Sequence, residues 1–191
     1  MELAAVGSDN AHVVGGYDHA LLLKADGSVL SWGRNGEGQI GNGGTSSQVR
    51  SASCLPSAIR ICASASHVHN RAPSQATPAT VSALPSAAVQ IAAGGASSYA
   101  MLVDGSVWAW GWNAWGQLGD GTSTARLSPV RIEGYGADTA MRLPPGGAAA
   151  FTMFVVAADG TAMGSGSNDY GQLGNGEATT SSPYGVLTAG A

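Results

Sequence analysis

Residues 104–121 read DGSVWAWGWNAWGQLGDG, and closely similar stretches occur at two other places in the chain of 191 residues. Residues 26–43 read DGSVLSWGRNGEGQIGNG, and residues 159–176 read DGTAMGSGSNDYGQLGNG. In all three copies Asp-Gly, a central Gly, an Asn and a Gly-Gln-(Ile/Leu)-Gly segment recur at the same offsets. Agreement in register over this length identifies an internal repeat, so the fold is built from one repeated unit.

Each copy has the pattern of a β-hairpin. Apolar runs flank Asp-Gly in HALLLKADGSVLSWG, which starts at His19, and in SYAMLVDGSVWAWG, which starts at Ser98. Gly tolerates the positive φ of a type I′ turn, so we expect two strands joined by such a turn. A further apolar run precedes each hairpin and predicts another strand. The glycine-rich segment after the hairpin predicts a tight turn that approaches a neighbouring unit closely.

The spacing of the copies is typical of β-propeller blades, which repeat at about 50 residues. The interval is 55 residues from Asp104 to Asp159 but 78 from Asp26 to Asp104, so the first interval contains an insertion of roughly 25 residues. We expect four segments along the chain: a first blade at 1–47, a basic and irregular or disordered insertion loop at 48–75, a second blade at 76–131, and a third, divergent blade with the start of a next at 132–191.

These residues resemble the regulator of chromosome condensation (RCC) repeat family. The motif Asp-Gly-x-Val-x-x-Trp-Gly-x-Asn-x-x-Gly-Gln-Leu-Gly is nearly whole at 26–41 and 104–119, and Gly-Gly-x-x-His-x-x-x-Leu precedes it at 15–23. The other copies depart from the motif at its His and Trp positions, with Ser98 and Thr152 in the place of His19, and Ser165 in the place of Trp32 and Trp110.

The resemblance implies an all-β fold of β-propeller blades, with about three repeats of a seven-bladed ring. Such a ring needs roughly 360 residues at about 51 per blade, so three blades cannot close it. An open arc leaves unpaired edges and an exposed apolar wall, which proteins normally cover. Three alternatives stay open: part of a longer propeller, self-association that completes the ring, or an arc capped by another protein.

The composition excludes several function classes. Only 10% of the residues are charged, against about 25% in an average protein. The net charge of -4 argues against general binding of nucleic acid or of a membrane surface, since both need a basic excess.

The N-terminus lacks a charged region followed by a long apolar run, so we expect a cytoplasmic protein with two reduced cysteines and no membrane span.

The insertion combines potential metal ligands with an excess of positive charge. Its Cys and His residues have the spacing C-x7-C-x4-H-x-H, at Cys54, Cys62, His67 and His69. This matches no common zinc pattern, and we expect neither a metal nor another cofactor.

Residues 38–103 contain three Arg and no Asp, Glu or Lys, which makes that span +3 and the remainder -7. The loop could meet an acidic partner or phosphate, or it could be solvated and disordered.

The tryptophans of the second copy are the first candidates for a binding site. Trp110 aligns with Trp32 and Trp108 with Leu30, which predicts packing in the blade core. Trp112 and Trp115 align with residues of differing polarity, which leaves two alternatives. They are either exposed to solvent and contact a partner, or they are partly buried against the next blade. The candidate partner contacts are these two tryptophans and their polar or aromatic equivalents, Arg34, Glu37, Trp112, Trp115 and Tyr170.

Other polar residues recur once per copy and are expected to be structural. Asp26, Asp104 and Asp159 precede the turn glycine and should stabilise the hairpin turn. The repeated Asn and Gln of the glycine-rich segment should hydrogen-bond the backbone and hold each blade to its neighbour. His19 should be structural too. No motif pairs a nucleophile with a base, so we expect no catalytic residues and no enzyme.

The residues and the resemblance together predict a protein-protein interaction scaffold that binds another protein, of unknown identity, through loops on a rigid frame. The resemblance also implies two alternatives. One is guanine-nucleotide exchange on a small GTPase, as in the family's founding member. The other is an inhibitor-type binding protein, as in secreted bacterial members.

Overall fold

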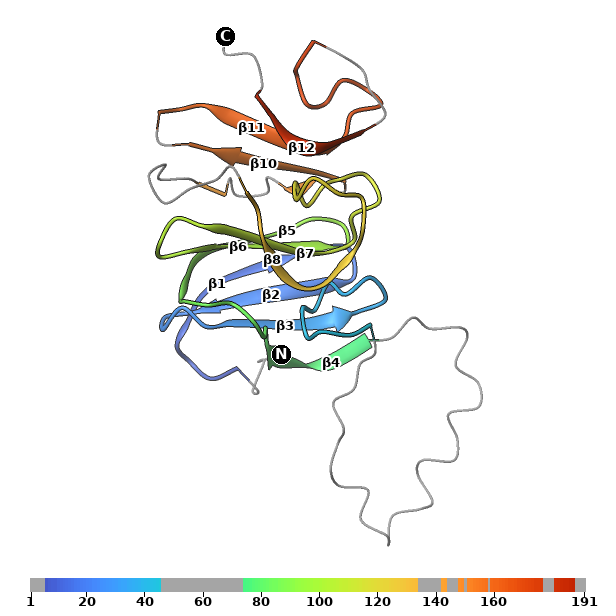
Figure 1. Ribbon diagram of the computed structural model, residues 1–191. Helices are drawn as coiled ribbons and strands as arrows, with labels where there is room; N and C mark the ends of the chain where they lie inside the picture. The colour runs from blue at the N-terminus through green and yellow to red at the C-terminus, as the bar shows by residue number, and fades with distance from the viewer. Residues whose placement is uncertain are drawn as a thin grey trace, which may run out of the picture.

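In the computed structural model the chain forms three antiparallel β-sheets of four strands each, stacked one on another (Figure 1). The structure describes residues 6–45, 74–133, 142–143, 148–149, 151–157, 159–176 and 181–187. The element order along these residues is strand after strand, with no helix. The predicted all-β propeller blades are therefore confirmed.

Each sheet takes four strands in chain order. The first contains β1 (Asn10–Gly15), β2 (His19–Lys24), β3 (Val29–Arg34) and β4 (Ser74–Thr80). The second contains β5 (Ala88–Ala93), β6 (Ser97–Leu102), β7 (Val107–Gly111) and β8 (Arg126–Arg131). The third contains β9 (Ala148–Ala149), β10 (Thr152–Val156), β11 (Ala162–Ser167) and β12 (Ser181–Leu187).

Two segment boundaries differ from the expected ones. β4 pairs with β3, so the first blade includes residues 74–80, whereas the sequence predicts 74–75 in the insertion and 76–80 in the second blade. β12 pairs with β11 and completes the third sheet, in the position where a next blade was expected to start. The hairpin motif marks only the two middle strands of a blade, and the outermost strand carries no repeat signature that assigns it to the preceding or the following blade.

The Asp-Gly turns have a different geometry from the type I′ turn that we expected. The loop contains three residues, because the Lys24 N–H donates to the Ser28 carbonyl at 2.9 Å and the Gly27 N–H donates to the Lys24 carbonyl at 3.0 Å. Only Gly27 has a positive φ, of 81°. This is the three-residue hairpin with a glycine bulge, in which Asp26 need not leave the right-handed region. Asp26 instead accepts hydrogen bonds from the Ser28 N–H and hydroxyl, at 2.9 and 2.7 Å.

The register of the strands corrects one alignment within the repeat. His19 is paired with Gly33, and the corresponding pair in the second sheet is Ser97 with Gly111. Ser97, not Ser98, is therefore the equivalent of His19. Thr152 pairs with Gly166 and keeps its predicted equivalence.

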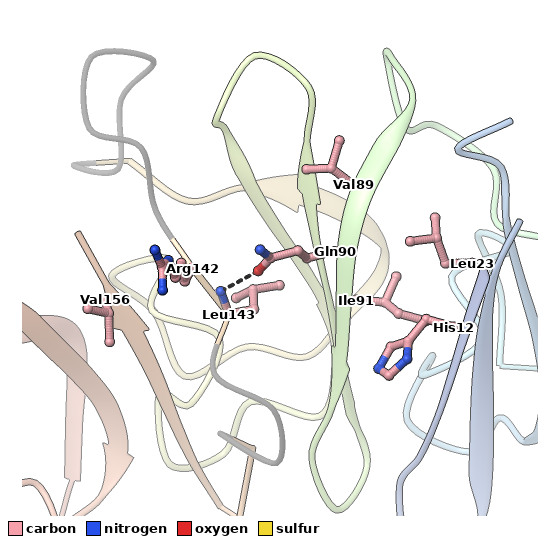
Figure 2. A pocket seen from close by; sticks show the side chains of 8 residues that line it. All are labelled: His12, Leu23, Val89, Gln90, Ile91, Arg142, Leu143 and Val156. Atoms are coloured by element: carbon pink, nitrogen blue, oxygen red, sulfur yellow. Dashed lines mark hydrogen bonds between the residues drawn. The ribbon is translucent and has the colours of Figure 1, made fainter. Parts of the chain in front are cut away.

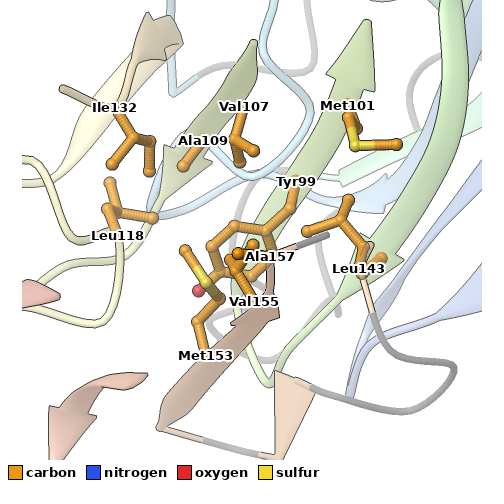
Figure 3. Packing of buried hydrophobic residues seen from close by; sticks show 11 residues of the cluster. Tyr99, Met101, Val107, Ala109, Leu118, Ile132, Leu143, Met153, Val155 and Ala157 are labelled. Carbon is orange, nitrogen blue, oxygen red and sulfur yellow. The ribbon is translucent and has the colours of Figure 1, made fainter. Parts of the chain in front are cut away.

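The cores lie between the sheets. Successive side chains of a strand point to opposite faces, so β6 contributes Ala100 and Leu102 to the core against the first sheet, and Tyr99 and Met101 to the core against the third. Figure 3 shows the second of these clusters, where Tyr99 lies among side chains of both sheets. The second sheet is buried on both faces, which explains why all six side chains of β6 are buried.

Among the described residues, no helix has the length and apolar character required to cross a membrane.

Candidate partner-binding face

The glycine-rich loop after the third strand is held by its own Asn and Gln. Asn113 accepts a hydrogen bond from the Leu118 N–H at 2.9 Å, and Gln117 accepts one from the Trp115 N–H at 3.0 Å. The first and third blades repeat both bonds at the equivalent residues. The prediction that these side chains hydrogen-bond the backbone is confirmed. These hydrogen bonds fix the backbone conformation of the residues between the Asn and the Gln.

Contact with the next blade comes from the Gln main chain. The Gln39 carbonyl accepts hydrogen bonds from Trp110 Nε1 at 3.0 Å and from Ser98 Oγ at 2.8 Å, both in the second blade. The Gln117 carbonyl accepts one from Ser165 Oγ of the third blade at 3.2 Å. Trp110 is fully buried, as its alignment with Trp32 predicts for a core residue.

The glycine-rich loops lie at the same end of the blades as the turns between the first and second strands. In each blade the residue that precedes the Asn donates its N–H to the turn: Arg34 to Asp18 at 2.7 Å, Trp112 to Ala96 at 2.9 Å, and Ser167 to Phe151 at 2.9 Å. These paired segments form one face of the molecule.

Three aromatic rings from three different blades meet on this face. Trp112 of the second blade contacts Phe151 of the third, with ring centroids 5.3 Å apart and an interplanar angle of 73°. Tyr17 of the first blade contacts the same Phe151, at 6.4 Å and 86°. Both are edge-to-face geometries within the favourable range for aromatic pairs. We call Tyr17, Trp112 and Phe151 the aromatic cluster.

The aromatic cluster is open to solvent at two of its three rings. Tyr17 is 69% exposed and Phe151 is 40% exposed, whereas Trp112 is half-buried. Trp112 is thus half-buried against Phe151 of the next blade, and its role as a partner contact stays a prediction.

The other predicted contact residues lie apart from the cluster. Arg34 makes an ion pair with Asp18 at 3.4 Å, and both side chains are about half exposed, so that part of the face carries no net charge. Glu37 and Trp115 are half-buried on the loops of the first and second blades. Tyr170, on the third, is 94% exposed. Their role as partner contacts stays a prediction.

Sequence reasoning did not find Tyr17 and Phe151. Both belong to the turn between the first and second strands, where the equivalent residues of the three blades share no side-chain type. An aromatic residue next to Gly16 in a predicted surface turn was the available signal for Tyr17, because Tyr is enriched at protein interfaces relative to the rest of the surface.

A pocket of about 550 Å3 lies between β1 and β5 and extends to residues 142–143 (Figure 2). Its polar side chains are His12, Gln90 and Arg142, and the rest of its lining is aliphatic: Leu23, Val89, Ile91, Leu143 and Val156. Gln90 accepts a hydrogen bond from the Leu143 N–H at 2.8 Å, which links the second blade to the third. Among the described residues that line it there is no carboxylate, hydroxyl or thiol that could act as a nucleophile.

Most of the insertion lies outside the described residues. This includes Cys54, Cys62, His67 and His69 together with Arg50, Arg60 and Arg71. Within the described part of the chain, no group of three or more His, Cys, Asp or Glu side chains is placed to hold a metal ion.

Comparison with known proteins agrees with this architecture. The model of the regulator of chromosome condensation (RCC1) repeat matches residues 26–101 and 104–139, and a second model of the same repeat matches residues 11–39 and 88–117. Among solved structures, human WBSCR16 superposes with a TM-score of 0.71 at 24% identity over 93% of this chain. Prp20p from Saccharomyces cerevisiae superposes with a TM-score of 0.67 at 19% identity over 96% of this chain.

Curated relatives are much longer than this chain. Human probable E3 ubiquitin-protein ligase HERC3 is 34% identical over 116 residues, which is 60% of this chain and 9% of that protein. The ultraviolet-B receptor UVR8 of Arabidopsis thaliana is 28% identical over 163 residues, 85% of this chain and 30% of that protein. The chain spans 39% of each of the two solved structures. On the strength of the matched repeats and the three four-stranded blades, the chain belongs to the regulator of chromosome condensation (RCC1) repeat family.

Proposed function

We propose that the chain is a protein-protein interaction scaffold whose partner contacts the aromatic cluster. The observation that carries the proposal is the meeting of Tyr17, Trp112 and Phe151, one ring from each blade, with two of the rings open to solvent. Aromatic side chains that group on a surface are enriched at the centres of protein interfaces, because each buries a large area at a small cost in side-chain entropy.

The frame beneath the cluster favours binding without rearrangement. The Tyr17 N–H donates to the Gly95 carbonyl of the second blade at 2.9 Å, and the Phe151 carbonyl accepts from the Ser167 N–H. The turns that carry two of the three rings are therefore fixed by main-chain hydrogen bonds. A surface already ordered in its bound geometry loses less conformational entropy on association.

The chemistry of the face specifies an apolar contact. Asp18, the residue after Tyr17, is neutralised by its ion pair with Arg34, so charge does not select the partner there. The side chains best suited to pack against Tyr17 and Phe151 are aliphatic or aromatic, supplied by a segment of another protein.

We expect no enzymatic activity from the described residues. The carboxylates of Asp26, Asp104 and Asp159 accept hydrogen bonds in their hairpin turns, which holds the pKa of each below its ordinary value. They are therefore ionised and held in turns, and no second acid or base accompanies them within these turns.

Selection from a library of displayed random peptides tests the scaffold proposal. The library is selected on the immobilised chain and then compared on two variants, Tyr17→Ser with Phe151→Ser as a double variant, and Tyr170→Ser as the control. The control removes an aromatic ring that is more exposed than Tyr17 or Phe151 and lies outside the cluster. We expect peptides rich in aliphatic or aromatic residues that bind the parent chain and the control at least tenfold more tightly than the double variant. Equal binding to all three proteins would refute the cluster as the contact.

Guanine-nucleotide exchange is the alternative that family membership suggests. The relative Prp20p is known for its binding to Gsp1p and histones, and it has also been solved with Kap60. If this chain acts on a small GTPase, it must accelerate the release of labelled guanine nucleotide from at least one member of a GTPase panel. Unchanged release from every member removes this alternative and leaves the scaffold proposal untouched.

A further inference from the structure

The aromatic cluster combines its exposed rings with two hydrogen-bond donors that have no partner within the described part of the chain. The indole N–H of Trp112 makes no hydrogen bond there and reaches solvent, whereas those of Trp108 and Trp110 each donate to an oxygen atom at 3.0 Å. The hydroxyl of Tyr17 is also unpaired among these residues, and Tyr17 is largely exposed. The cluster therefore offers two side-chain donors to a bound molecule.

The main-chain acceptors around the rings already have donors. The carbonyl groups of Gly95, Ala96 and Phe151 each accept a main-chain N–H at 2.9 Å. The Trp112 carbonyl accepts a hydrogen bond from the Ser97 hydroxyl at 2.8 Å. The unpaired polar groups that the rings bring to the surface are thus donors, which favours a ligand with free acceptors and few N–H groups of its own.

Proline has these properties. It carries a carbonyl group but no N–H, and its saturated ring is an aliphatic surface that can pack on an aromatic side chain. Segments rich in proline form the polyproline II helix, which has no internal hydrogen bonds, so their carbonyl groups stay free, and aromatic surfaces commonly bind them. An α-helix uses its carbonyl groups internally. A β-strand needs a sheet edge, whereas this face consists of turns whose main-chain N–H groups of Arg34, Trp112 and Ser167 are engaged.

We infer that the aromatic cluster binds a proline-rich segment of the partner in the polyproline II conformation. Proline rings pack against Tyr17 and Phe151, and the Trp112 indole N–H and the Tyr17 hydroxyl donate to peptide carbonyl groups. The inference rests on the scaffold proposal, because it names the partner chemistry of the same site. Such a segment is stiff before it binds and meets turns that are themselves fixed, so little conformational entropy is lost. The three rings come from three blades of this chain and lie at the ends of these blades, so the site needs no further blade.

Fluorescence anisotropy with two labelled peptides tests the inference. One probe is a peptide of about ten prolines. In the other, leucine and serine alternate over the same length, so it is apolar but keeps its N–H groups. We expect the proline peptide to bind the parent chain about tenfold more tightly than the leucine peptide. The double variant Tyr17→Ser with Phe151→Ser should lose this binding, and Tyr170→Ser should retain it.

Two conservative variants test the donors separately from the rings. Trp112→Phe keeps an aromatic ring and removes the indole N–H, and Tyr17→Phe keeps the ring and removes the hydroxyl. Each should weaken the binding of the proline peptide about three- to tenfold, which is the effect of one lost hydrogen bond. Trp115→Phe is the matched control, because Trp115 lies on the loop that follows Trp112 and outside the cluster. It should bind the peptide like the parent chain, and all of these proteins should have unchanged circular dichroism.

The results separate this inference from the scaffold proposal. If the displayed library yields peptides without proline that depend on the cluster, and the proline peptide does not bind, the polyproline inference is overturned and the scaffold proposal stands. Binding of the proline peptide that both conservative variants leave unchanged also overturns the inference, because the two donors then play no part. If no peptide of either kind depends on the cluster, both proposals fail.

Discussion

His19 Nε2 lies 2.9 Å from Ser98 Oγ, and this hydrogen bond crosses the junction between the first and second blades. The Ser98 hydroxyl donates its proton to the Gln39 carbonyl at 2.8 Å, so it can only accept from the imidazole. His19 must therefore carry its proton on Nε2, and its buried Nδ1 has no partner. The ring is 5% exposed, and Gly16 packs directly against it.

Burial makes the His19 junction sensitive to acid. Desolvation lowers the pKa of His19 from the ordinary 6.5 to about 4, although the charge of Asp18 and the nearby Ser97 backbone act in the opposite direction. Between pH 6.5 and 4 the unfolded chain thus binds a proton that the folded chain excludes, so the free energy of unfolding falls as the pH falls through this range. The loss amounts to about 3 kcal/mol at 1.36 kcal/mol per pKa unit.

Urea unfolding of the parent chain and of His19→Gln at pH 7, 5.5 and 4 measures this effect. Gln keeps an N–H donor for Ser98 but does not titrate. We expect a smaller decrease in the free energy of unfolding for the variant, by about 3 kcal/mol across the range. Parallel pH profiles for the two proteins would show that folding does not lower the pKa of His19.

Trp110→Phe should weaken the first blade junction. The substitution removes the indole hydrogen bond to Gln39 and leaves a gap beside Gly41, while the Gln39 carbonyl keeps its bond from Ser98. We expect a loss of about 2 to 3 kcal/mol in the free energy of unfolding, from the lost volume and hydrogen bond together. Trp115→Phe is the control on a half-buried loop residue and should cost less than about 1 kcal/mol. Similar losses for both variants would argue against a specific role for Trp110.

The sequence predicts those features that depend on the repeat itself. Trp110 aligns with Trp32, and the offset alone indicates a core position. The Asn and Gln of the loop recur between glycines, and their hydrogen bonds lie within the same short segment, so local sequence is sufficient to predict them. The hydrogen bonds of Asp26 and its equivalents also lie within one short turn, so local sequence is sufficient to predict them.

The features that sequence does not predict depend on how the strands pair and how the blades pack. Tyr17 and Phe151 are far apart along the chain, and they meet only because the fold brings turns of the first and third blades together on one face. β4 carries no motif, and its place in the first sheet is set by pairing with β3 across the insertion. The shift from Ser98 to Ser97 as the equivalent of His19 follows from strand register, which the alignment of the preceding glycines does not determine.

Gly111 and Gly160 form a matched pair that separates backbone strain from close packing. Both have a positive φ, of 99° and 88°. A methyl group on Gly111 would collide with the Ala96 carbonyl oxygen and lie 3.2 Å from Gln39 Cα, whereas one on Gly160 would meet nothing within 4 Å. We expect Gly160→Ala to cost about 1 to 2 kcal/mol, from the positive φ alone. Gly111→Ala should exceed this by at least about 2 kcal/mol, because backbone of two blades must move apart. Thermal and urea unfolding check both values. Equal losses in the free energy of unfolding would show that the backbone around Gly111 adjusts to an added methyl group at little cost.

Trp112→Ala should destabilise the chain where Trp115→Ala does not. The Trp112 ring packs edge-to-face on Phe151, so its removal loses an aromatic pair and the burial that joins the second and third blades. We expect a cost of about 1 to 2 kcal/mol. Phe151→Ala should cost a similar amount.

The double variant Trp112→Ala with Phe151→Ala should cost less than the sum of the two single losses, by about 0.5 to 1.5 kcal/mol, because both substitutions remove the same contact. Trp115 makes no ring contact within the described part of the chain, so the Trp115→Ala and Phe151→Ala losses should simply add. Additive losses for Trp112 and Phe151 would show that the rings do not interact in solution.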